Sequence, residues 1–151
     1  VARGWIDGDF HWSPPVLEHF GVVVAHPQAA PVSQLEELAG KPLGTVYGYR
    51  YPQFEQSLGK RFVRDDAPSM LINLRKLAAH RMDYAVTEQI TLEYHNKLHP
   101  KDGLRAALQL SPYRTHCVFT LAHELPLDKL DQAARDMVRE GTVERILSRY
   151  R

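Results

Sequence analysis

The spacing of apolar residues changes several times along the chain and predicts alternating strands and helices. Residues 20–25 form a continuous apolar run, which indicates a strand buried on both faces. Within residues 69–80, Leu71, Leu74 and Leu77 recur at helical spacing. The same criteria predict further strands at 42–47, 61–64 and 82–87, and helices at 33–40, 51–58 and 90–98. Strand and helix therefore alternate three times within about sixty residues, which favours a mainly parallel sheet flanked by helices.

The two ends of the chain differ from the middle in composition and in the pattern of apolar residues. Residues 1–19 are rich in Trp, Gly, Asp and Pro, with Pro14 and Pro15 adjacent, and are predicted to be irregular. After Ser111 and Pro112, residues 115–121 read as an apolar strand, and two helices separated by a glycine follow. Each helix has one apolar stripe, so each needs a surface to pack against.

These patterns divide the chain into three parts. We expect an irregular N-terminal segment at 1–19, an α/β ligand-binding lobe at 20–112, and a C-terminal strand with helices at 113–151. The break near residues 111–114 is the predicted hinge or lobe boundary.

Composition narrows the class of protein. The 151 residues are 44% hydrophobic and 25% charged, as in a globular domain, and no apolar run is long enough to span a bilayer. Nineteen Lys and Arg against eighteen Asp and Glu give a net charge of +1, which offers no reason to expect a nucleic-acid partner. Cys117 is the single cysteine, so an internal disulfide and a multi-cysteine metal site are excluded. Placed in an apolar strand, it is expected to be buried.

Three segments resemble family 3 extracellular solute-binding proteins, the periplasmic receptors of amino-acid ABC importers. Residues 38–48 read LAGKPLGTVYG and are similar to the start of the second lobe in that family. Residues 77–88 read LAAHRMDYAVTE and resemble the next strand region, and residues 130–151 resemble the C-terminal helices. The resemblance spans about residues 20–151.

The resemblance implies a fold, a function and a location. It implies a periplasmic-binding-protein-like lobe of type II, with a mainly parallel sheet, and C-terminal helices that belong to a second, incomplete lobe. It implies binding of an amino acid or similar small polar solute in an interlobe cleft, with ABC transporter membrane subunits as partners and a periplasmic location. Family members have a complete first lobe before this region. Its absence here predicts a truncated receptor, whose exposed apolar faces favour a homo-oligomer.

A loop at residues 48–51 carries candidate ligand-binding side chains: Gly48, Tyr49, Arg50 and Tyr51. It lies between a predicted strand and a helix start, where free backbone N–H groups and the helix dipole favour an anion. Arg50 offers a bidentate contact to a carboxylate, and the tyrosines offer aromatic walls. The resemblance assigns this loop to the ligand's carboxylate. The alternative is a surface turn whose aromatics cover the sheet edge.

Glu88 follows directly on the strand predicted at 82–87, at the end where parallel sheets place their ligands. The resemblance puts it where the family carries an Asp that accepts the ligand's ammonium. The alternative is an acid favoured at a helix N-terminus by the dipole.

Other polar residues are interpreted structurally. Asp65 and Asp66 are adjacent and are expected in a solvated turn rather than as a catalytic pair, and Ser69 is expected to cap a helix. His95 and His99 stand four residues apart, but no H-E-x-x-H motif accompanies them, so we expect no metal.

No catalytic motif is present, and neither an enzyme nor a cofactor is expected. Three alternatives to a transport receptor stay open. The chain is a sensor or regulatory binding module, a truncated form that binds nothing, or an enzyme of dehydratase type, for which Glu88 is the one acid–base candidate.

Overall fold

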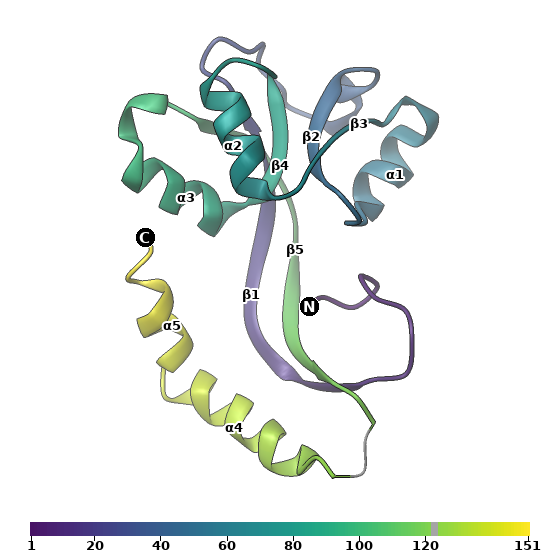
Figure 1. Cartoon of the computed structure of the whole chain (residues 1–151), viewed down its shortest axis with the longest axis vertical. Helices are drawn as coiled ribbons and strands as arrows, with labels where there is room; N and C mark the ends of the chain where they lie inside the picture. The colour runs from purple at the N-terminus through teal and green to yellow at the C-terminus, as the bar shows by residue number, and fades with distance from the viewer. Residues whose placement is uncertain (122–123) are drawn as a thin grey trace. The chain divides into compact units, whose positions relative to one another are not determined.

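A computed structural model describes residues 1–121 and 124–151 and contains a five-stranded sheet in the order β3-β2-β4-β1-β5 (Figure 1). The strands are β1 (His11–Ala25), β2 (Pro42–Val46), β3 (Val63–Ala67), β4 (Tyr84–Glu88) and β5 (Arg105–Phe119). The helices are α1 (Pro52–Leu58), α2 (Met70–Ala78), α3 (Gln89–Leu98), α4 (Leu127–Arg139) and α5 (Thr142–Leu147), with short 3₁₀ turns η1 (Leu35–Leu38), η2 (Gly59–Arg61) and η3 (Pro100–Asp102).

The chain forms two compact units, each described separately below. Unit 2 comprises Phe20–Ser111, and unit 1 comprises Val1–His19 together with Pro112–Arg151. Strands β1 and β5 both continue across the boundary between the units. Among the described residues, no helix is long and apolar enough to cross a membrane.

In unit 2 the centre of the sheet is parallel. β2 pairs in parallel with β3 on one side and with β4 on the other, while β4 pairs antiparallel with the Gly21–Ala25 part of β1. Helix α1 connects β2 to β3 and helix α2 connects β3 to β4, as the crossovers between parallel strands require. The prediction of an α/β fold with a mainly parallel sheet is confirmed.

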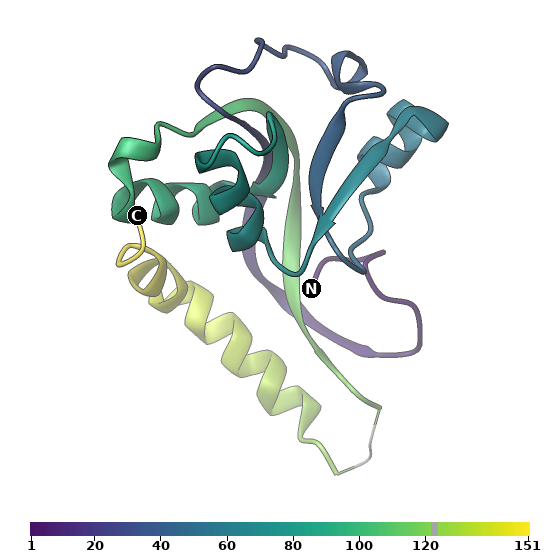
Figure 2. The ribbon, with the colours of Figure 1, turned by 45° about the horizontal axis from the view of Figure 1, so that its top comes forward.

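The sheet of unit 2 is covered on both faces (Figure 2). Side chains alternate along a strand, so Val23 and Ala25 pack with α1 on one face, while Val22 and Val24 pack with α2 and α3 on the other. This double burial explains why the sequence shows a continuous apolar run there. Twenty of the twenty-two buried apolar side chains among the described residues belong to unit 2.

Unit 1 consists of the remaining parts of β1 and β5 with α4 and α5. Its strand contacts include the Cys117 N–H, which donates to Ser13 Oγ at 3.0 Å, and an Arg114–Glu18 ion pair of 2.7 Å. The sequence positions rise on one strand as they fall on the other, so the two strands run in opposite directions. Cys117 is exposed, contrary to the expectation from sequence, and it lines an open apolar groove together with residues of α4 and α5.

One expectation about strands is wrong: residues 11–19, predicted to be irregular, belong to β1. Strand β5 runs through Ser111 and Pro112, where the division into units falls, and a hinge or lobe boundary there stays a prediction. Proline is tolerated in a strand where its missing N–H is not required by a neighbour. The described ladder between β1 and β4 is confined to residues 21–25, so Pro14 and Pro15 lie outside it.

Candidate ligand-binding edge of the unit 2 sheet

The ends of β2, β3 and β4 meet at one edge of the sheet in unit 2. Val46 at the end of β2 pairs with Ala67 at the end of β3. Gly44, two residues before Val46 on β2, pairs with Ala85 of β4. The helices α1, α2 and α3 begin just beyond these strand ends. The free N–H groups of three helix starts therefore lie along the carboxyl edge, where open parallel sheets bind their ligands.

The loop after β2 divides into an exposed part and a buried part. Gly48 has a φ of 76°, a left-handed conformation that favours glycine, and the Tyr49 N–H donates to the Val46 carbonyl at 3.1 Å. This turn leaves Tyr49 47% exposed and Arg50 exposed, while Tyr51 is only 8% exposed. Tyr47, which the sequence interpretation did not include, is the most exposed of the three tyrosines at 79%.

Tyr51 has the contacts of a core residue. Its hydroxyl oxygen accepts the Val46 N–H at 2.8 Å, and its ring meets Phe54 and Phe62 edge-on, each with a centroid separation of 6.3 Å. Burial raises the pKa of the Tyr51 phenol, although the hydrogen bond from Val46 and the positive charge of Arg64 oppose the shift. These contacts account for Tyr51 structurally, and a ligand contact for it stays a prediction.

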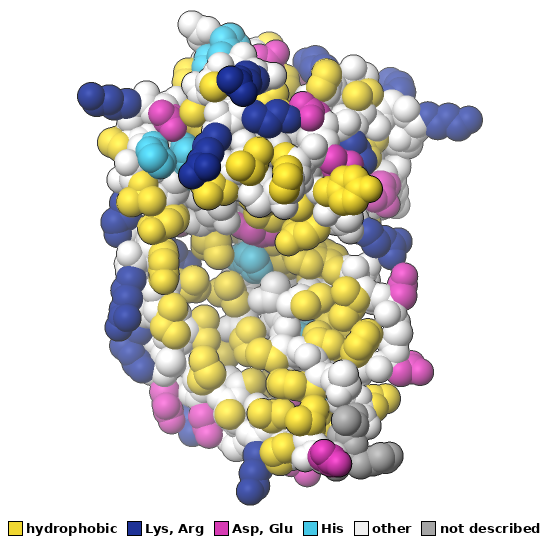
Figure 3. Space-filling model, in the orientation of Figure 1, with side chains coloured by type: hydrophobic (Ala, Val, Ile, Leu, Met, Phe, Trp, Pro, Cys, Tyr) yellow, Lys and Arg dark blue, Asp and Glu magenta, His cyan; other side chains and the backbone are white. Residues whose placement is uncertain are grey.

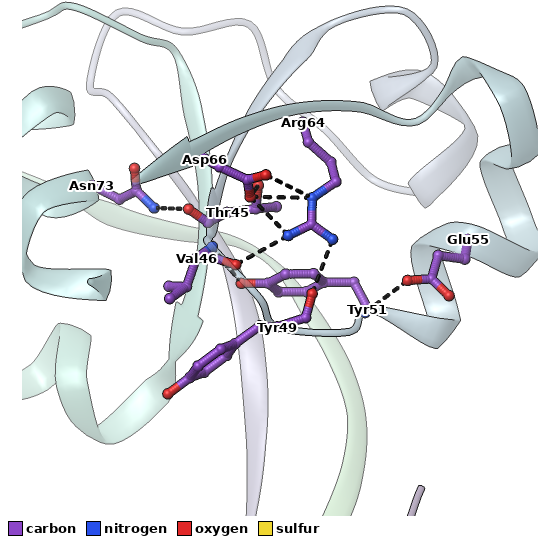
Figure 4. Close-up of polar contacts among 8 residues, drawn as sticks. All are labelled: Thr45, Val46, Tyr49, Tyr51, Glu55, Arg64, Asp66 and Asn73. Atoms are coloured by element: carbon purple, nitrogen blue, oxygen red, sulfur yellow. Dashed lines mark hydrogen bonds and ion pairs between the residues drawn. The ribbon is translucent and has the colours of Figure 1, made fainter. Parts of the chain in front are cut away.

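Arg64 fixes the conformation of this loop through contacts with its backbone (Figure 4). Its guanidinium donates to the carbonyl oxygens of Tyr49 and Val46, at 2.9 and 3.0 Å. It also lies over the Tyr51 ring, 5.1 Å from the centroid, in a cation–π arrangement. One side chain thus holds both ends of the turn that carries Tyr49 and Arg50.

Asp66 orients Arg64 in turn. The Asp66 carboxylate accepts from Arg64 Nη2 at 2.7 Å and Nε at 3.1 Å, and from the hydroxyl of Thr45 at 2.7 Å. The hydrogen bond from Arg64 lowers the pKa of Asp66, and the bond from Thr45 adds to this against the opposing effect of burial. Asp65 points elsewhere and pairs with Lys76 at 2.7 Å.

The sequence interpretation missed this network. Asp65 and Asp66 lie in strand β3 and not in a solvated turn, because β3 extends to Ala67. The available signal was the spacing of Arg64 and Asp66, which two positions apart share one face of a strand. The prediction that the two aspartates do not form a pair agrees with their separate partners.

Glu88 is the last residue of β4 and the residue before α3, opposite Gly21 of β1 in register. It is partly buried and stands at the same carboxyl edge as the 48–51 loop. Ser69 caps α2 as predicted, since its Oγ accepts the Ile72 N–H at 3.3 Å.

His95 of α3 and His99, the residue after its end, lie close together. His95 is buried and its Nε2 lies 2.9 Å from a carboxylate oxygen of Asp102, and the His99 ring is 4.9 Å from the His95 ring. The described residues contain no group of three or more His, Cys, Asp or Glu side chains arranged to hold a metal ion.

Comparison with known proteins gives matches in structure and none in sequence. No protein-family model and no curated protein matches the chain. An ancestral arginine-binding protein bound to arginine is similar with a TM-score of 0.78 and 20% identity over 93% of this chain and 64% of its own. The arginine-, lysine-, histidine-binding protein ArtJ of Geobacillus stearothermophilus gives a TM-score of 0.76 and 19% identity over 93% and 62%. The periplasmic VFT2 domain of Bordetella pertussis BvgS gives 0.76 and 18% over 94% and 61%.

These matches decide the fold. The chain has the type II periplasmic-binding-protein fold. It covers 57% to 64% of the length of such neighbours, so it corresponds to part of the fold as they carry it. The neighbours are binding proteins rather than enzymes.

Proposed function

We propose that the chain binds a small zwitterionic solute, an amino acid or a close analogue, at the carboxyl edge of the unit 2 sheet. The observation that carries the proposal is the meeting of the 48–51 loop and Glu88 at that edge, which two parallel strands bring together from distant parts of the chain.

The charges of these residues suit the two ends of an amino acid. Arg50 is exposed on a turn at a helix start and offers a charge-assisted contact to a carboxylate. Glu88 offers a carboxylate to an ammonium group. Tyr49, nearly half exposed, supplies an aromatic surface beside Arg50. Arg64 and Asp66 serve as positioning residues, because their contacts hold the turn that precedes the exposed Arg50.

The neighbours support this class of ligand. Two of the similar structures are bound to arginine and glutamine, and another is a receptor for L-cysteine. All of these ligands share an α-carboxylate and an α-ammonium group, and they differ in the side chain. We therefore expect the proposed site to bind the α-carboxylate and the α-ammonium group, which all of these ligands share.

A thermal-shift screen with amino acids, polyamines and small carboxylates tests the proposal. A ligand present at 100 times its Kd stabilises the folded state by about 2.7 kcal/mol. For a protein of this size, that corresponds to an increase in Tm of about 5–10 °C. An increase with amino acids alone supports the proposal. No increase with any compound at millimolar concentration would show that the chain alone does not bind them.

Variants then locate the site. Glu88→Gln and Arg50→Gln are each expected to weaken binding by about ten-fold or more in calorimetric titrations, because each removes one charge-assisted contact. Glu36→Gln, at an exposed position on η1, is the matched control and should leave Kd unchanged. An unchanged Kd for Glu88→Gln would remove that residue from the site.

For the cellular role, we propose an exported, periplasmic solute-binding component of an amino-acid ABC importer, with the transporter's membrane subunits as partners. A periplasmic sensor domain is the second candidate, and the similarity to a periplasmic VFT2 domain of BvgS supports the location alone. If the loaded chain stimulates ATP hydrolysis by such an importer in proteoliposomes, the receptor role is supported. Ligand binding without stimulation favours the sensor.

A further inference from the structure

A second pocket lies at the opposite, amino edge of the unit 2 sheet, with a volume of about 490 Å³. It is lined by Lys41, Arg81 and Asp83, which precede β2 and β4, by Tyr84, the first residue of β4, and by Asp65 of β3. Its size is within the range of small-molecule sites. The pocket therefore has room for an organic ligand and a mixed lining to hold one.

The acidic side chains of this pocket already have basic partners. Asp65 pairs with Lys76 Nζ at 2.7 Å, and Asp83 lies 3.3 Å from His80 Nε2, which carries a charge only when protonated. The two cations, Lys41 and Arg81, have no ion pair within the residues that the structure describes. The pocket thus presents two cationic side chains that form no ion pair within the described part of the chain.

The backbone that carries the two cations is well defined. Arg81 ends a Schellman motif at the close of α2, in which its N–H donates to the Lys76 carbonyl at 2.8 Å and the His80 N–H to that of Leu77 at 2.8 Å. His80 occupies the position usually taken by glycine, with a φ of 51°. Its ring stacks on His26 at 3.7 Å. A left-handed backbone at a non-glycine residue is held in place here by these side-chain contacts.

Lys41 is positioned from the other side. Its N–H donates to the Leu38 carbonyl at 3.0 Å, and its ammonium lies 5.5 Å from the centroid of the Tyr84 ring. The Tyr84 hydroxyl donates to the Ala30 carbonyl at 2.7 Å, which fixes the ring as a wall of the pocket. With Met82 buried beside it, this wall is apolar.

We propose that this amino-edge pocket is a second binding site, for a small organic anion whose carboxylate or phosphate group is held by Lys41 and Arg81. The apolar body of the ligand lies against Tyr84 and Met82. The site is separate from the proposed solute site, because strands β2 and β4 run parallel and their opposite ends are about 13 Å apart.

Titrations of the full chain followed by amide chemical shifts test this site, with benzoate and phenyl phosphate as probes at constant ionic strength. Saturable shifts at Gly40, Lys41 and residues 81–84 are expected, and benzyl alcohol, which has no charge, should not produce them. The probe that binds more tightly distinguishes a carboxylate site from a phosphate site.

Paired variants give the decisive comparison. Lys41→Gln with Arg81→Gln should weaken binding by about ten-fold or more. Lys60→Gln with Arg75→Gln removes the same two charge types from exposed positions of unit 2 and should change Kd less than about two-fold. Asp83→Asn, which removes a negative charge from the pocket, should tighten binding by about three-fold.

Two outcomes would overturn the proposal. One is the absence of saturable shifts with either probe. The other is an equal loss of affinity in both double variants, which would mean that the anions respond to the net charge of the chain and not to this pocket. Variants in the 48–51 loop should leave the shifts unchanged, so failure here and failure of the solute-site proposal can be told apart.

Discussion

Arg64→Gln most directly tests the network in which Arg64 binds Asp66 and the backbone of the loop after β2. It removes the ion pair with Asp66 and the two hydrogen bonds to the Val46 and Tyr49 carbonyls. The Arg64 and Asp66 side chains are 28% and 30% exposed, so solvent weakens the pair and we assign it about 1 kcal/mol. The two hydrogen bonds to carbonyls add about 0.5–1 kcal/mol each. The expected loss of stability is therefore about 2–3 kcal/mol.

Urea unfolding measured by far-UV circular dichroism is the assay. Both tryptophans, Trp5 and Trp12, belong to unit 1, so tryptophan fluorescence would report on the wrong unit. A loss of about 2–3 kcal/mol lowers the urea midpoint by about 1 M or more. Arg61→Gln, an exposed arginine shortly before β3, is the control and should change the midpoint by less than about 0.3 M.

The pH dependence gives an independent check. Because the folded-state pKa of Asp66 is lowered, the carboxylate stabilises the fold above its unfolded pKa of about 3.8. This stabilisation is lost as the pH falls through the lower, folded-state value. A double-mutant cycle of Arg64→Gln with Asp66→Asn should therefore give a coupling of about 1 kcal/mol at pH 7 that disappears in acid. A coupling near zero at pH 7 would refute the role assigned to the network.

Three further expectations concern packing, capping and association. Gly44→Ala places a methyl carbon 2.7 and 2.8 Å from two neighbouring side-chain atoms, so thermal unfolding should show a loss of about 1–3 kcal/mol; an unchanged Tm would contradict this close packing. Ser69→Ala removes the acceptor for the Ile72 N–H and should cost about 1 kcal/mol, with the exposed Ser57→Ala as control. Unit 1 exposes an apolar groove, so light scattering should report a dimer or larger assembly that Met137→Glu disperses, and a monomeric parent chain would contradict this.

The alternation of elements was predictable because each element of unit 2 carries its own periodic signal. The helix expected at 69–80 is α2 at Met70–Ala78, with the predicted cap at Ser69. The apolar run at 20–25 marked a strand covered on both faces. Such signals depend on neighbouring residues alone, so they can be recognised in a single sequence.

The missed features depend on contacts between distant segments. Arg64 and Asp66 become a network because β3 pairs with β2 in a register that sets Asp66 beside Thr45. No local pattern specifies that register. Similarly, the turn at Gly48 decides which tyrosine faces inward, and the sequence alone offered Tyr49 and Tyr51 as equivalent candidates.

The strand at residues 11–19 was missed for a different reason. A strand covered on one face has a weaker pattern than a buried one, and two prolines with several polar residues hide it further. Prediction from pattern is therefore strongest in unit 2, where burial on both faces imposes the clearest constraint on residue type.

The same difference in burial bears on where function resides. Among the described residues of unit 1, the only buried apolar side chains are Ala2 and Ala134, and an apolar groove of about 360 Å³ lies between its strands and its helices α4 and α5 (Figure 3). So few buried groups do not offset the entropy of ordering nearly sixty residues, which means that unit 1 needs a further covering surface. Unit 2 has two apolar clusters of its own and carries both proposed sites. Ligand binding at its carboxyl edge can therefore be measured whatever covers unit 1, and a failure to bind would be informative about the edge itself.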